Sequence, residues 1–177
     1  MAGVGVAVAG LEFVLAVVGL GSDAQTSAKL EEMDRKLDDI DAGIGTVSSQ
    51  ILQSAVSEAR TARQQLDNFA VLDTSDPVIR ERERDQIIDR ADGALNDVLA
   101  QADARLSAGA THETVMETLG AVSFALGVRF KVGLELEAGP LGAVGVREQV
   151  TTASDLFESA EGLLRSAIYR EQDDTVA

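Results

Sequence analysis

Apolar side chains between residues 30 and 51 recur at alternating spacings of three and four, which places them on one stripe of a helix. Charged and other polar residues fill most positions between them, so the stripe has the a/d pattern of a coiled coil. We expect this stripe to be an assembly seam, either antiparallel within one bundle or between two chains. Its members are Leu30, Met33, Leu37, Ile40, Ile44, Val47 and Ile51.

Beyond this seam the apolar stripe continues with successive spacings of four, which resemble a stutter in a coiled coil. The continuous pattern predicts one long helix over about 23–72. Gly43 and Gly45 lie inside it and are poor helix formers, so a kink or hinge is expected at that point.

A turn near 73–76 separates this helix from the next one. Asp76 is a suitable N-cap residue, and Pro77 suits the first helical position because its missing N–H would be unpaired there in any case. The second helix should reach about residue 107. Residues 23–107 are therefore predicted to form a long αα-hairpin.

The hydrophobic period changes near residue 128. Thr111 is expected to cap a helix, but from Val128 onward apolar residues alternate with polar residues and glycine, which predicts a half-buried strand. Gly139-Pro140 marks a turn, so we expect a short strand or hairpin near 128–146, paired with 141–146, with 3–9 or with another subunit. A last helix is predicted over 152–170.

These elements predict a mainly α protein, an elongated helical bundle or αα-hairpin with coiled-coil character plus the short β element. Its 177 residues suit a single domain over 1–177. Within it we expect an apolar segment over 2–21, the hairpin over 23–107, a helix followed by the β element over 111–146, and the last helix.

Residues 2–21 are almost wholly apolar and carry only one charged side chain, that of Glu12. The segment is close to the length that spans a bilayer, but an acid at its middle costs about 2.5–3.5 kcal/mol on insertion scales. It is therefore predicted to be a buried helix at a core or subunit interface, a membrane-entering helix, or an unstructured or strand-like start. No positive charge precedes it, so it does not match a secretory signal peptide.

The composition excludes several kinds of chemistry. A net charge of −15 argues against nucleic-acid binding, which needs clustered Lys and Arg. The chain has no Cys and a single His, which removes thiolate sites and most histidine chemistry. Asp39-x-Asp41-x-Gly43 does not continue as a calcium loop, because the positions of its glycine and bidentate Glu hold Ile44 and Gln50. We expect no catalytic residue, cofactor, metal or small-molecule substrate, and hence not an enzyme.

The two segments with least charge and most glycine, 2–21 and 119–146, suggest membrane action by an acidic helical rod. In outline this layout resembles that of α-helical pore-forming toxins, which combine long helices with a hydrophobic tongue or terminal helix. It implies a non-enzymatic, self-assembling protein that associates with or inserts into membranes. The expected membrane or interface residues are Leu11, Phe13, Val14, Leu15, Val17, Val18, Leu119, Val122, Phe124, Leu126 and Phe130.

The alternative is a soluble coiled-coil scaffold, or a structural subunit of a homo-oligomeric assembly, in which the same segments are subunit contacts. Both hypotheses expect a homo-oligomer, and the first adds a lipid membrane as a partner. Without a signal peptide, the chain is expected to be made as a soluble cytoplasmic protein that becomes membrane-associated or is released later.

Overall fold

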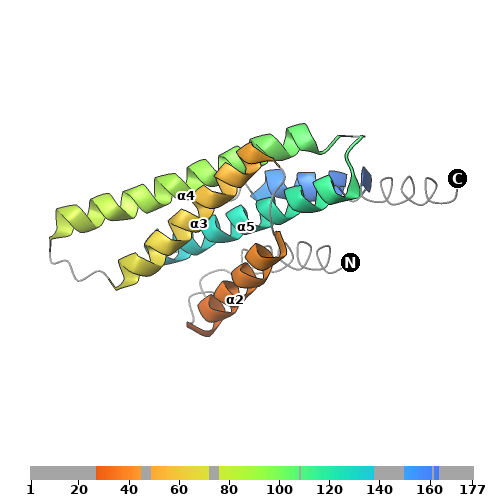
Figure 1. Ribbon diagram of the computed structural model, residues 1–177. Coiled ribbons are helices and arrows are strands. Elements are labelled where there is room, and N and C mark those ends of the chain that lie inside the picture. The colour runs from red at the N-terminus through yellow and green to blue at the C-terminus, as the bar shows by residue number, and fades with distance from the viewer. Residues whose placement is uncertain are drawn as a thin grey trace, which may run out of the picture.

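The computed structural model describes residues 27–44, 49–71, 76–107, 109–137, 150–160 and 162–163. Its labelled helices are α2 (Ser27–Ile44), α3 (Gln50–Ala70), α4 (Pro77–Arg105) and α5 (His112–Leu136), and residues 150–160 and 162–163 are helical as well. These ranges contain no strand. The protein is therefore mainly helical, as its sequence predicted, and the helices form a bundle (Figure 1).

Helix α5 is the central element of this bundle. It packs against α2, α3 and α4, while α3 and α4 also pack against each other along their length (Figure 1). Every residue from Thr118 to Gly133 on α5 is buried. Leu, Val, Ala and a few larger side chains build the core around it, with Phe124 as one of its largest fully buried members.

Side-chain caps set the starts of three helices. The Asp76 carboxylate accepts hydrogen bonds from the backbone N–H groups of Val78 and Ile79, and Pro77 opens α4, as the sequence predicted. The Thr111 hydroxyl accepts from the N–H of Thr114 at the start of α5. Ser49 does the same for α3, where its hydroxyl accepts from the N–H of Leu52. Each cap satisfies a backbone donor that has no partner within its helix.

The long helix expected over 23–72 is present as two helices, α2 and α3. Helix α2 ends at Ile44, next to the two glycines, and α3 begins after its own cap at Ser49. Glycine costs about 0.8–1 kcal/mol relative to Ala within a helix, and a Ser cap offers the chain a new start. The ion pairs between the two helices join Asp34 to Arg63 and Asp41 to Arg60, so α3 runs back along α2.

This break divides the predicted seam. Its α2 members face the core and are at most 7% exposed, whereas Ile51 on α3 is 61% exposed. The side chain of Leu30 and the whole of Val47 lie outside the described residues. The buried members pack on α5 of the same chain, and Ile44 approaches so closely that a Cβ added at Gly120 would lie 3.1 Å from its Cγ1. The buried part consists of Met33, Leu37, Ile40 and Ile44.

The predicted strand is wrong where the structure describes it, because residues 128–136 continue α5 as helix. The remainder of the expected β element, 138–146, lies outside the described residues. An alternating pattern indicates a strand only if its polar side chains face water. Here Arg129 and Lys131 are each only 3% exposed, so these polar side chains are buried like the apolar side chains between them. A helix that is buried on all sides has no solvent-exposed face. Its sequence therefore does not show the alternation of polar and apolar faces with a period of 3.6 residues.

Two helical glycines are predicted to respond in opposite directions to a larger side chain. Gly93→Ala on α4 should raise the free energy of unfolding by about 0.5–1 kcal/mol, because its added Cβ meets nothing within 4 Å. Gly120→Val should lower it by about 1–3 kcal/mol, because the new side chain must displace Ile44. Urea unfolding followed by circular dichroism measures both. A Gly120→Val variant as stable as the parent would contradict this packing of α2 on α5.

Candidate functional site

Lys131 lies in the middle of the bundle with its ammonium group among three carboxylates. The side chain comes from the buried face of α5, and its Nζ lies 3.2 Å from an Asp34 oxygen and 3.3 Å from an Asp67 oxygen. A third carboxylate, that of Glu135 one turn along α5, is 3.0 Å away. Because Asp34 belongs to α2 and Asp67 to α3, one cation connects three helices.

Arg129, two residues earlier on α5, makes the equivalent connection to α4. Its Nε donates to Asp92 Oδ1 at 2.6 Å. Its two terminal nitrogens donate to the two oxygens of Glu137, at 2.6 and 3.3 Å. This paired arrangement with Glu137 is the fork geometry in which guanidinium and carboxylate bind most strongly.

We refer to the two cations and their five acids as the α5 ion-pair network. Helices α2, α3 and α4 each supply one aspartate, namely Asp34, Asp67 and Asp92 respectively. Glu135 lies in the last turn of α5, and Glu137 is the residue that follows the helix as its C-cap. The network thus contacts every labelled helix of the bundle.

The network extends along the contact between α2 and α3 through Asp34. The same carboxylate that meets Lys131 also lies 3.3 Å from Arg63 of α3. Arg63 reaches Asp38 at 2.9 Å, and Arg60 reaches Asp41 at 2.6 Å, both on α2. Three acids on one side of α2 therefore face basic side chains of α3. These outer pairs are more exposed than the α5 pairs and stabilise the fold less.

Burial and pairing act in opposite directions on the two cations. Burial by itself lowers the pKa of the Lys131 ammonium, but the hydrogen bond to Glu135 and the charges of Glu135, Asp34 and Asp67 outweigh it. The net pKa of Lys131 is raised above its ordinary value of 10.5. For Arg129, hydrogen bonds and charges from Glu137 and Asp92 likewise outweigh burial and raise the pKa. Both side chains are therefore charged at neutral pH.

The chemistry of this network is structural. Its cations are already matched by several carboxylates each, and they are buried rather than directed into a cleft. In the described ranges no cluster of histidine and acidic side chains has the arrangement of a metal site. What the network can do is position α5: a buried cation separated from its acids would cost several kcal/mol, so α5 cannot slide or turn without breaking these pairs.

The membrane or interface residues predicted on α5 lie within the core of the bundle. All are at most 4% exposed. None of the described helices is both long enough and apolar enough to cross a bilayer. The predicted residues of the first segment, Leu11 to Val18, lie outside the described residues. The α5 set is Leu119, Val122, Phe124, Leu126 and Phe130.

Sequence reasoning did not identify Arg129 and Lys131 as a site, because the alternating pattern assigned them to a strand. One signal was available: they are two cations within an otherwise apolar stretch, in a chain that has only three lysines. Basic residues inside so apolar a segment require nearby acids if the segment is buried.

No family model, curated protein or solved structure matches this chain.

The raised pKa of Lys131 predicts a loss of stability in alkaline solution. A cation whose pKa is higher in the folded state stabilises fully below its unfolded pKa of about 10.5 and loses that contribution as pH rises through the folded pKa. Lys131→Arg keeps its charge above pH 12, so its free energy of unfolding should fall less between pH 9 and pH 12 than that of the parent chain.

Lys36→Arg is the matched control, because it makes the same change at a partly exposed position on α2. Its stability should follow the parent profile. Denaturant unfolding at several pH values measures all three proteins. Equally steep alkaline losses in Lys131→Arg and in the parent chain would show that the Lys131 pairs do not hold the bundle.

Proposed function

We propose that this chain is a non-enzymatic, self-assembling helical protein that associates with membranes. In this proposal residues 2–21 enter the lipid, and the acidic bundle of α2 to α5 remains in water. The observation that carries it is the contrast between the two apolar segments. The α5 segment is used as the centre of the bundle and is fixed there by ion pairs, whereas 2–21 has one acid in twenty residues and no base.

The charges of α5 support assigning the lipid contact to 2–21. Moving α5 into a bilayer would separate Arg129 and Lys131 from the aspartates of α2, α3 and α4. A single charge at the centre of a membrane helix costs about 2.5–3.5 kcal/mol or more. Residues 2–21 would bring in only Glu12. As a helix, twenty residues would measure about 30 Å, which is the thickness of the hydrocarbon layer.

Self-assembly would reduce the cost of Glu12. Acids within membrane segments normally face other helices or a water-filled space rather than lipid tails. Small residues recur at a spacing of four in Gly3/Ala7 and Gly5/Ala9, which permits close approach of neighbouring helices. Several copies of 2–21 would therefore pack together with their Glu12 side chains turned inward.

A soluble scaffold is the second candidate, and the observation that favours it is apolar exposure at the end of the α3–α4 hairpin. Val71 and Val78 there are 80% and 72% exposed, which suits a contact with another chain. The α2 stripe, however, packs on α5 of the same chain, so most of the seam that would have made a coiled coil is already in use. We therefore place the membrane proposal first.

Vesicle flotation tests the membrane proposal. The purified chain should float with phosphatidylcholine vesicles in physiological salt, and Leu15→Asp should reduce the bound fraction at least about tenfold, because it adds a second acid near the middle of 2–21. Adding phosphatidylserine should weaken binding at low salt, since a body of net charge −15 is repelled by an anionic surface.

Ile51→Asp is the matched control, because it places the same side chain at an apolar position exposed on the bundle. It should float as well as the parent. Absence of flotation with any vesicle, or equal flotation of Leu15→Asp and the parent, would contradict the proposal. If light scattering shows a monomer in the absence of vesicles, the membrane role still stands. A protein that is monomeric when bound to vesicles would contradict self-assembly.

A further inference from the structure

Helices α2 and α3 share one apolar stripe, although they are separate helices of the bundle. Every member of the stripe follows the previous one at a spacing of three or four, and this phase continues across 45–48. A loop between two helices does not require its flanking helices to keep a common phase, whereas one continuous helix does. The sequence therefore also fits a second arrangement, in which α2 and α3 form a single helix. The stripe consists of Met33, Leu37, Ile40, Ile44, Val47, Ile51, Ala55, Ala59, Ala62 and Leu66.

The arrangement within one chain leaves part of this stripe unused. Ile44 at the end of α2 is 7% exposed and Ala55 on α3 is 3% exposed, but Ile51 between them is 61% exposed. Each helix end at the break also leaves backbone groups without partners in its own helix, and the Ser49 hydroxyl satisfies one of them. A single helix would pair these groups along its own backbone.

Helix α2 makes contacts that a second copy of the chain can supply equally well. Its apolar stripe packs on α5, and Asp34 reaches Lys131 there. Arg60 and Arg63 of α3 reach across to its acids. A second copy presents the same groups in the same positions, so a transferred α2 would form each of these contacts again. For this reason, exchange of an identical element is a low-cost route to a dimer.

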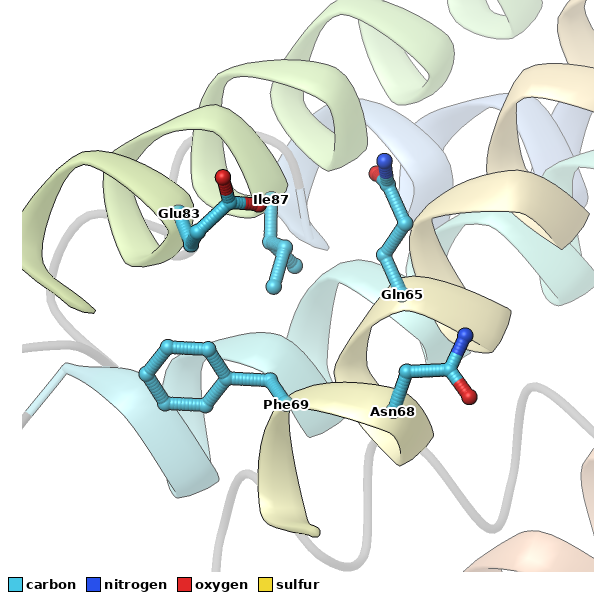
Figure 2. A pocket seen from close by; sticks show the side chains of 5 residues that line it. All are labelled: Gln65, Asn68, Phe69, Glu83 and Ile87. Atoms are coloured by element: carbon cyan, nitrogen blue, oxygen red, sulfur yellow. The ribbon is translucent and has the colours of Figure 1, made fainter. Parts of the chain in front are cut away.

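The other three labelled helices hold together through contacts that do not involve α2. Figure 2 shows Phe69 of α3 and Ile87 of α4 beside a cavity of about 250 Å³, whose described lining residues all come from these two helices. The ion pair of Arg129 with Asp92 connects α4 to α5. These contacts stay within one chain when α2 is transferred, so α3, α4 and α5 form a unit that can receive an α2 from either chain.

We propose that two copies of this chain exchange α2 to form a dimer. In the dimer, α2 and α3 of each chain form one helix, and α2 docks on α5 of the other chain. Asp34 then pairs with Lys131 of the partner subunit, and the apolar stripe of α2 faces the same kind of surface as before. Each copy gives and receives the same helix, so the dimer has two-fold symmetry. The exchange does not depend on whether residues 2–21 enter lipid.

An engineered disulfide between α2 and α5 tests the exchange, because the natural chain has no Cys. A Cβ added at Gly120 would lie 3.1 Å from Ile44 Cγ1, so Ile44→Cys combined with Gly120→Cys places two thiols close enough to form a disulfide. The full-length double variant is refolded at millimolar concentration, its monomer and dimer are separated by size-exclusion chromatography, and both are oxidised.

A non-reducing denaturing gel should then show pairs of linked chains from the dimer and single chains from the monomer. In an exchanged dimer each disulfide joins two chains, whereas in the monomer it closes within one chain. Absence of a dimer fraction, or a dimer whose oxidised chains migrate singly after all thiols are consumed, would overturn the proposal.

Removal of a helix cap gives an independent test in chains without Cys. Ser49→Ala should lower the dissociation constant of the dimer at least about tenfold, because the N-cap of α3 is used only when α2 and α3 are separate helices. Sedimentation equilibrium in buffer without vesicles measures this constant. Since no lipid is present, the result is independent of the flotation experiment.

Thr111→Ala is the matched control, because it removes the equivalent cap from α5, which both arrangements use. It should change the dissociation constant less than about twofold. The same dissociation constant for Ser49→Ala and Thr111→Ala would contradict the exchange of α2.

Discussion

Two positive charges lie inside the most apolar helix of this protein, and the arrangement of the bundle follows from the need to neutralise them. Lys131 and Arg129 would be strongly destabilising if they were buried alone. Three neighbouring helices each place one aspartate against them, and two glutamates at the end of α5 complete the set. Each acid has a fixed position on its own helix. The ion pairs therefore define which part of each helix lies beside Arg129 and Lys131 of α5.

These pairs contribute more to the uniqueness of the fold than to its total stability. Burying apolar side chains is the main favourable term in folding, and well-packed hydrophobic residues often replace buried ion pairs without loss. Apolar side chains such as Leu and Val, however, tolerate several alignments of one helix on another, whereas a buried cation tolerates only those that bring it an acid. In this bundle the requirement acts on α2, α3 and α4 together.

The sequence predicted the features that depend on local chemistry. Asp76 with Pro77, and Thr111, start their helices as their side chains and backbone preferences require. The apolar stripe of α2 faces the core, as the sequence predicted. This prediction was possible because the opposite face of α2 is exposed to water and carries charged residues. The strand prediction failed because α5 buries Arg129 and Lys131 together with the apolar side chains around them. Where polar and apolar side chains are both buried, their alternation does not indicate a strand. The break after Ile44 depends on a choice between a glycine-containing helix and a new cap at Ser49, which spacing alone does not decide. The cavity beside Gln65 arises from how α3 meets α4, and no local pattern encodes it.

Hydrogen exchange followed by mass spectrometry tests the central position of α5 most directly. If α5 is the inner helix held by its ion pairs, the amides of 118–133 should exchange more slowly than those of any other described segment, and far more slowly than those of the exposed first turns of α4, 77–86. Exchange of 118–133 as fast as that of 77–86 would contradict the account.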